Sequence, residues 1–201
     1  MNRGEVYAAA RTMAGRPNMS SDDLDICVQM LEGELNRKLR EHPRNLRRAS
    51  YTLPTEALAT SPPQYLRLPT DIARVESLID SDGNDYDVYS PKKRGNIERG
   101  YIPRGDCLEV IPTPEYESVW YLDYYAFLDS ISGSDELLNW VTTYYPDVYI
   151  FGLLKYIAVY TKDKENLAQW AKDFAQVLED VVGQGWDQNI GAAPHSSRYG
   201  G

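Results

Sequence analysis

Hydrophobic residues at helical spacing mark the N-terminal part of the chain. A short helix is expected over residues 4–14, and a clearer one follows it with Ser20 or Ser21 as the cap. One face of this second helix repeats apolar residues at spacings of three and four, namely Leu24, Cys27, Val28, Leu31, Leu35 and Leu39. The opposite face is polar and carries Glu32, Asn36, Lys38 and Arg40. The pattern therefore predicts an amphipathic helix that ends before Pro43.

The pattern changes near Ser50 to short apolar or aromatic runs separated by turn residues. Strands are expected near residues 51–53, 66–69, 75–79, 86–89, 101–102, 108–111 and 119–127. Turns are predicted at residues 81–84 and 104–106, which contain glycine and aspartate. Both alternating sets of residues in 119–127 are largely apolar or aromatic, so this strand is expected to be covered on both faces. The middle of the chain thus predicts an antiparallel β-domain.

Helical spacing returns after Ser134, which is expected to cap a helix with Asp135 and Glu136 in its first turn. The stretch from Asn139 to Leu154 that follows is densely aromatic and nearly uncharged. Within it, Tyr145-Pro146-Asp147 predicts the start of a new helix, because proline is tolerated in a first turn whose N–H groups have no helical partner. This helix is apolar almost all round, which predicts that it is buried on several sides.

A membrane span is not expected in this stretch. The apolar run from Val148 to Tyr160 is shorter than the roughly 20 residues that cross a bilayer, and it contains Lys155. A buried helix in a globular assembly is the better interpretation.

A last helix is predicted to open at Asp163, and residues 185–201 have no apolar period. We expect this extension to be flexible and to become ordered on a partner, with Trp186 and Tyr199 as anchors. The expected fold class is α+β, a small helical bundle from both chain ends with an inserted antiparallel β-domain and a flexible C-terminal tail. The expected segments are residues 1–50 and 129–184 for the bundle, 51–128 for the β-rich insertion and 185–201 for the extension.

Composition fits a globular protein, with 42% hydrophobic residues in a chain of 201. The N-terminus lacks the apolar segment of a secretory signal, so a cytosolic protein with reduced Cys27 and Cys107 is expected. Cys27 is predicted to be a small core residue. The cysteines and the histidines, His42 and His195, show no metal-ligand spacing, so we expect neither a metal nor a cofactor.

Charge is unevenly distributed along the chain. The net charge of -9 argues against a protein that wraps nucleic acid over its whole surface. However, residues 37–48 contain a basic cluster with Glu41 as the only acid, made up of Arg37, Lys38, Arg40, Arg44, Arg47 and Arg48. Residues 105–154 contain nine acids and no lysine or arginine. A basic and an acidic surface would suit contact between copies or with a charged partner. The same charge distribution fits equally well with two faces that are simply exposed to solvent.

Catalytic motifs are not found. The sequence has no glycine-rich phosphate loop, nucleophile elbow or His-Glu-x-x-His motif. Its many carboxylates do not single out a pair that could flank a glycosidic bond. No helix-turn-helix or zinc module accompanies the basic cluster. An enzyme is therefore not expected; the alternatives that stay open are a DNA-binding accessory protein using Arg37 to Arg48 and a cell-wall glycan hydrolase.

Four motifs, in this order, resemble the head-to-tail adaptor (connector, or head completion) proteins of tailed bacteriophages. They are the helix ending in Leu39-Arg40, the step at residues 65–71, the strand closing on residues 108–114 and the helix start at residues 145–154. The resemblance covers about residues 20–182 and implies a structural virion protein. In that family copies form a ring, usually of twelve, which joins the portal vertex to the tail while DNA passes through its centre.

The resemblance also implies partners and contact residues. The partners would be the portal protein, tail or nozzle proteins and further copies of the chain, without a membrane, at the head–tail junction of the virion and in the host cytoplasm during assembly. The residues expected at a contact between copies are Tyr145, Pro146, Asp147, Tyr149, Phe151 and Gly152. The C-terminal extension would bind the portal through Trp186, His195, Arg198 and Tyr199. Proximity to DNA or to a neighbouring copy is expected for Arg37, Arg40, Arg44, Arg47 and Arg48.

Overall fold

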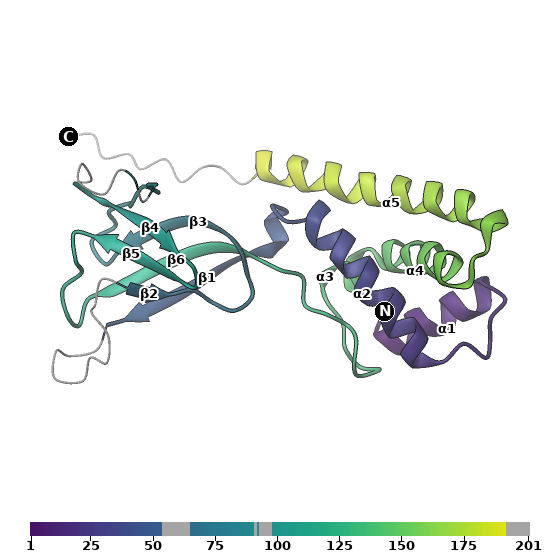
Figure 1. The fold of residues 1–201 in the computed structure, drawn as a ribbon. Coiled ribbons are helices and arrows are strands. Elements are labelled where there is room, and N and C mark those ends of the chain that lie inside the picture. The colour runs from purple at the N-terminus through teal and green to yellow at the C-terminus, as the bar shows by residue number, and fades with distance from the viewer. Residues whose placement is uncertain (54–64, 91, 93–97, 192–201) are drawn as a thin grey trace. The chain divides into compact units, whose positions relative to one another are not determined.

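The computed structural model describes residues 1–53, 65–90, 92 and 98–191, with side chains described as far as residue 183. It has the α+β composition expected, and it divides into two compact units. The helical unit comprises residues 1–44 and 128–201, and the β-unit comprises residues 45–127 (Figure 1). Both chain ends therefore contribute to the helical unit, with the β-unit inserted between them.

The helical unit is built from α1 (Arg3–Met13), α2 (Ser21–Lys38), α3 (Trp140–Tyr144), α4 (Pro146–Thr161) and α5 (Lys164–Gly191). Ser20 caps α2 by accepting a hydrogen bond from the backbone N–H of Asp23, as expected. Leu24, Cys27 and Leu31 on the predicted apolar face of α2 are buried. The prediction for Cys27 is confirmed.

The third helix begins later than the sequence suggests. Asn139, not Ser134, caps it, and its side chain accepts a hydrogen bond from the N–H of Thr142. Residues 135 and 136 form a turn and residues 137–139 are not helical, and the carbonyls of Asp135 and Leu137 accept hydrogen bonds from the N–H groups of Gly4 and Arg3. The start of α1 therefore holds this segment out of a helix, and the predicted cap at Ser134 is wrong.

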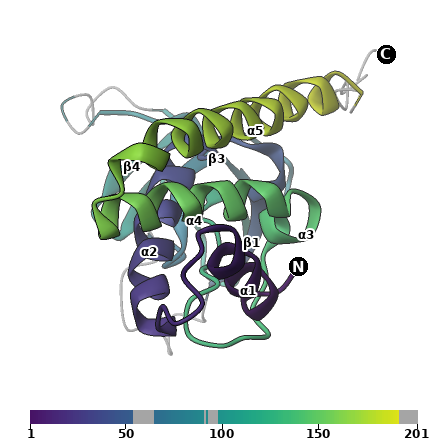
Figure 2. The ribbon, with the colours of Figure 1, turned by 90° about the vertical axis from the view of Figure 1, so that its right-hand side faces the viewer.

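Helix α4 is the central helix of this unit and begins at Pro146, as predicted. It packs against α1, α2, α3 and α5 and lies between α5 and α1 in two views (Figures 1 and 2). A Cβ atom on Gly152 would lie 2.4 Å from Cδ1 of Leu31 and 3.1 Å from Cε2 of Phe174. Glycine at this position thus lets α2 and α5 approach α4 closely. The apolar circumference of α4 is mostly covered within its own unit.

Helix α5 starts at Lys164, directly after the predicted Asp163, and buries Phe174, Leu178 and Val181. It continues to Gly191, beyond the end expected at residue 184. The first part of the expected flexible extension is therefore helical. Residues 192–201 lie outside the described part of the chain.

The β-unit contains two antiparallel sheets. The first has the order β1 (Leu46–Thr52), β6 (Val119–Ala126), β3 (Ile72–Asp80). The second has the order β2 (Tyr65–Arg67), β5 (Cys107–Ile111), β4 (Gly100–Arg104). Buried residues from both sheets form one core, including Leu78, Leu108, Trp120 and Leu122. The predicted antiparallel β-domain is confirmed.

Three details of the β-unit differ from the sequence-based expectation. The unit begins at Asn45 rather than residue 51, because Leu46, Arg47 and Arg48 pair with β6 as part of β1. Residues 86–89 do not form a strand; within them Val88 makes an isolated bridge to Tyr101. Strand β6 buries only one face; the other is half-buried, with Arg48 and Arg74 over the rings of Tyr121 and Tyr125.

Candidate interaction surfaces

The predicted contact stretch at the start of α4 is tied into the helical unit by a buried polar network. Nδ2 of Asn139 donates hydrogen bonds to the phenol oxygen of Tyr149 and to the carbonyl of Asp129, both at 2.7 Å. The Tyr149 hydroxyl in turn donates to Oε1 of Glu32 on α2 at 3.1 Å. Because all three side chains are buried, these bonds fix the position of α3 and α4 against α2.

Glu32 is the acceptor at the centre of this network. Its carboxylate also accepts hydrogen bonds from the backbone N–H of Ile131 at 2.8 Å and the hydroxyl of Ser130 at 2.7 Å. Burial raises the pKa of Glu32, and these hydrogen bonds oppose the shift only in part. The sequence placed Glu32 on a polar face, although it lies four residues after Val28 and three before Leu35, which are both buried. Residues three and four apart share a helix face, so this spacing already indicated that Glu32 lies beside the buried face of α2.

The six residues expected at a contact between copies differ in exposure. Tyr149 is fully buried and Gly152 contacts Leu31 and Phe174, so both belong to the core of the subunit and not to its surface. The others are half-buried or exposed: Tyr145, Pro146, Phe151 and, most exposed, Asp147. Tyr144, which the sequence did not single out, is 58% exposed. Its ring lies 4.2 Å from the guanidinium carbon of Arg44.

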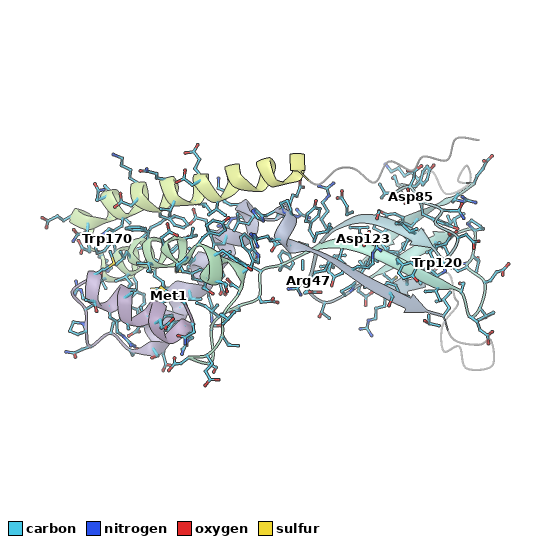
Figure 3. All side chains as sticks on the ribbon, turned by 180° about the vertical axis from the view of Figure 1, so that it is seen from behind. Met1, Arg47, Asp85, Trp120, Asp123 and Trp170 are labelled. Carbon is cyan, nitrogen blue, oxygen red and sulfur yellow. The ribbon has the colours of Figure 1, made fainter. Side chains whose placement is uncertain are left out.

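The structure divides the basic cluster between the two units. Arg47 and Arg48 lie on β1 and form ion pairs with Asp71 and Asp123, each at 2.6 Å. Figure 3 labels Arg47 and Asp123 among the side chains of the β-unit. Arg37, Arg40 and Arg44 belong to the helical unit and are exposed at the C-terminal end of α2 and just beyond it. The two strand arginines thus already have carboxylate partners, which the sequence could not show because the aspartates are distant along the chain.

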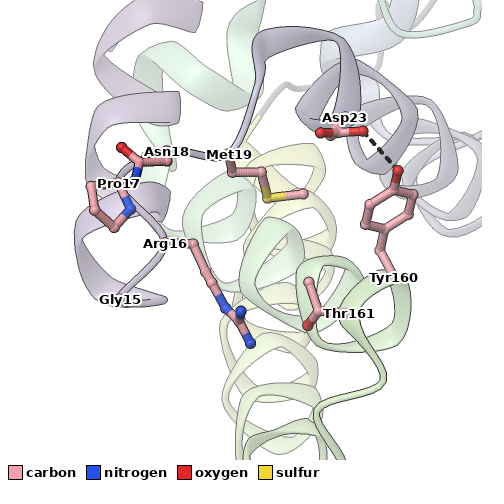
Figure 4. Close-up of a pocket in the computed structure, with 8 residues that line it drawn as sticks. All are labelled: Gly15, Arg16, Pro17, Asn18, Met19, Asp23, Tyr160 and Thr161. Carbon is pink, nitrogen blue, oxygen red and sulfur yellow. Dashed lines mark hydrogen bonds between the residues drawn. The ribbon is translucent and has the colours of Figure 1, made fainter.

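A pocket of about 390 Å³ lies between the loop after α1 and the end of α4 (Figure 4). Its lining mixes polar and apolar groups: Gly15, Arg16, Pro17, Asn18, Met19, Asp23, Tyr160 and Thr161. Asp23, its one carboxylate, accepts hydrogen bonds from the hydroxyls of Tyr160 and Ser20 at 2.7 Å. These bonds lower the pKa of Asp23. A single carboxylate engaged in this way does not provide the pair of acids that glycan hydrolysis uses.

Metal and membrane sites are also absent from the residues that the structure describes. No group of three or more His, Cys, Asp or Glu side chains among them could hold a metal ion. None of the helices in the described ranges is long and apolar enough to span a bilayer. Trp186 lies in α5, and the other residues expected to bind the portal, His195, Arg198 and Tyr199, lie outside the described residues.

Comparison with known proteins identifies the family. A family model described as SU10 adaptor protein matches residues 1–198, which include the β-unit and all but the last three residues of the helical unit and of the C-terminal extension. No curated protein matches the chain. The resemblance seen in the four sequence motifs is thereby confirmed. The family is structural, not enzymatic. The chain belongs to the SU10 adaptor protein family, a family of phage head-to-tail adaptors.

Proposed function

We propose that copies of this chain assemble into a dodecameric ring that joins the capsid portal to the tail and lets DNA pass through its centre. The observation that carries the proposal is the family match over residues 1–198, which places the chain among phage adaptors along nearly its whole length. A virion protein at the head–tail junction, assembled in the host cytoplasm, follows from this proposal.

The close packing of the helical unit supports a role as a rigid connecting part. Helix α4 is surrounded by four other helices and is joined to α2 by the buried Glu32 and Tyr149 side chains. Close packing and a satisfied polar network make such a unit resistant to deformation. A part that connects two larger assemblies benefits from this rigidity.

The proposed partners are the portal on one side and tail or nozzle proteins on the other. The decisive experiment mixes the purified chain with its cognate portal and images the product by electron microscopy. A ring stacked coaxially on the portal is the expected result. A portal that stays bare at high adaptor concentration would overturn the proposal.

The C-terminal extension is proposed to bind the portal. Because α5 continues to Gly191, a deletion of residues 192–201 leaves the described helix in place and is a sharper test than removal from residue 185. We expect this deletion to weaken portal binding at least tenfold, about 1.4 kcal/mol, without changing thermal stability. A chain of full length with residues 192–201 in scrambled order is the matched control for sequence. Unchanged binding by the deleted chain would remove the extension from the interface.

The proposed role of α5 side chains can be separated from that of the tail. Trp186 lies in the helix, so Trp186→Ala tests the helical part while residues 192–201 remain. Loss of portal binding in this variant alone would place the contact on α5. Loss in the deletion alone would place it on residues 192–201.

A further inference from the structure

Helix α2 carries a second stripe of residues, opposite its buried face. The stripe repeats at spacings of four, four, three and four and consists of Asp22, Ile26, Met30, Gly33 and Arg37. We call it the outer stripe of α2. Ile26 is 45% exposed and Met30 is 43% exposed, although both are large apolar residues. Helix α2 forms one flank of the helical unit (Figure 2).

Gly33 in the outer stripe is not explained by packing inside the chain. A Cβ atom at this position would have only one described atom within 4 Å, Nη1 of Arg37 at 3.9 Å. Glycine inside a helix is less favourable than alanine, because it loses more backbone freedom on folding. Gly152 is different, because Leu31 and Phe174 occupy the space where its side chain would be. A missing side chain on an exposed helix face allows close approach by a backbone from outside the chain.

The charges of the outer stripe are complementary to those of the same stripe on a second copy whose α2 runs in the opposite direction. Asp22 lies in the first turn of α2 and Arg37 in the last. In an antiparallel pair centred between Gln29 and Met30, Asp22 of each copy faces Arg37 of the other. The same register places Ile26 opposite Gly33, so that the large side chain fills the space left by the glycine. Two Met30 side chains then meet near the two-fold axis.

Neighbouring charged groups on α2 have partners within their own chain. Asp23 accepts hydrogen bonds from Tyr160 and Ser20. Glu34 accepts hydrogen bonds from Lys155 and Tyr156, and it also attracts Arg37 electrostatically. Lys38 adds a second positive charge beside Arg37. The antiparallel register therefore brings a basic helix end to an acidic one.

We infer that the outer stripe of α2 is a self-association surface on which a second copy packs its own α2 in antiparallel orientation. This pair is isologous, with the same stripe used by both copies, whereas neighbours in a ring use two different surfaces. It therefore goes beyond the proposed ring and does not depend on it. One helix of 18 residues is about 27 Å long, so the buried area is at the small end for protein interfaces and the pair forms reversibly.

Cysteine cross-linking of the full chain tests the register. Met30→Cys is expected to give disulfide-linked dimers under mild oxidation. Asp22→Cys and Arg37→Cys are each expected to remain uncross-linked alone but to cross-link when mixed, because residues 22 and 37 of one helix are about 22 Å apart. The unsubstituted chain is the background control, since Cys27 is buried and Cys107 half-buried. Dimers of Asp22→Cys alone would indicate parallel packing and overturn the inference.

Sedimentation of the full chain tests the energetics of the pair. Gly33→Leu is expected to weaken dimer formation about tenfold because it fills the space needed by Ile26, while the thermal midpoint is unchanged or higher. Gln176→Leu, on the exposed face of α5, is the matched control and should leave dimerisation unchanged. Asp22→Arg and Arg37→Asp should each weaken the dimer, and the double variant should restore it.

These measurements separate the inference from the proposed function. If a ring forms on the portal but Met30→Cys gives no cross-links, the antiparallel pair is wrong and the proposed function is supported. If the free chain stays monomeric at all concentrations, the antiparallel pair is likewise wrong and the proposed ring on the portal is unaffected. If Met30→Cys cross-links form but the portal stays bare, the antiparallel pair is supported and the proposed function is wrong.

Discussion

The hydroxyl of Tyr149 donates a hydrogen bond to Oε1 of Glu32 at 3.1 Å, and both side chains are buried in the helical unit. The two residues are 117 positions apart in the chain, so the bond joins the N-terminal and C-terminal segments that flank the inserted β-unit. Tyr149 also accepts a hydrogen bond from Asn139. An aromatic residue that seemed suited to a contact between copies thus serves the subunit's own core.

Removal of the Tyr149 hydroxyl should destabilise the fold measurably. Tyr149→Phe takes one hydrogen-bonding partner from buried Asn139 and one from buried Glu32, so a loss of about 1–2 kcal/mol in the free energy of unfolding is expected. Urea denaturation monitored by circular dichroism measures it. Tyr160→Phe is the control, because its hydroxyl bonds Asp23 at the surface, where water competes, and should contribute far less to stability. Equal losses in the two variants would contradict this account.

Asp25 should make stability depend on pH in the acid range. Burial alone would raise the pKa of Asp25, but hydrogen bonds from Arg3 and Tyr7 outweigh it and lower the pKa. The unfolded value is about 3.9, so the stabilisation is complete above about pH 5 and is lost as the pH falls through the folded pKa. Asp25→Asn should therefore be less stable than the unsubstituted chain at neutral pH, and this difference in the free energy of unfolding should shrink below about pH 3.

The measurement for Asp25 is the free energy of unfolding from neutral to acidic pH, compared with the unsubstituted chain. Asp22→Asn, an exposed change on the same helix, provides the control. Glu32 has the opposite direction of shift, because burial raises its pKa, and it contributes equally to all three proteins. A constant difference between Asp25→Asn and the unsubstituted chain at every pH would refute the assignment.

The two helical glycines should respond oppositely to alanine. Gly152→Ala should destabilise the chain by about 1–3 kcal/mol, because its Cβ would overlap Cδ1 of Leu31, and this exceeds the gain in helix propensity. Gly33→Ala should stabilise the isolated chain by about 0.5–1 kcal/mol, since its Cβ would meet only Nη1 of Arg37, at an ordinary contact distance of 3.9 Å. Thermal or urea unfolding at low protein concentration measures both. Destabilisation by Gly33→Ala would indicate a packing role inside the subunit.

Free adaptor should bind duplex DNA only weakly. The chain has a net charge of -9, and Arg47 and Arg48 of the basic cluster already pair with Asp71 and Asp123. We expect no measurable binding to a short duplex at about 150 mM salt in a fluorescence anisotropy titration. Steeply salt-dependent binding that is lost when Arg37, Arg40 and Arg44 become alanine would instead support the DNA-binding alternative. Alanine at Arg47 and Arg48 is the comparison.

Local chemistry made several features readable from the sequence. Ser20 as a cap, Pro146 as a first-turn residue and the apolar spacing of α2 depend on interactions within a few residues, and all three predictions are confirmed. The switch from helical spacing to short apolar runs located the β insertion for the same reason. The order of four motifs was enough to indicate the adaptor family, which the family match confirms.

Contacts between distant segments were decided only by the tertiary structure. Glu32 is buried because the N–H of Ile131 and the hydroxyls of Ser130 and Tyr149 converge on it. Asn139 replaces Ser134 as a cap because the start of α1 holds the preceding turn. The partners of Arg47 and Arg48 likewise come from other strands. The sequence by itself determined most of the helices and strands and the family, since these follow from short-range patterns. Only the folded chain decided which polar groups are buried and which surfaces stay open, because those depend on long-range packing.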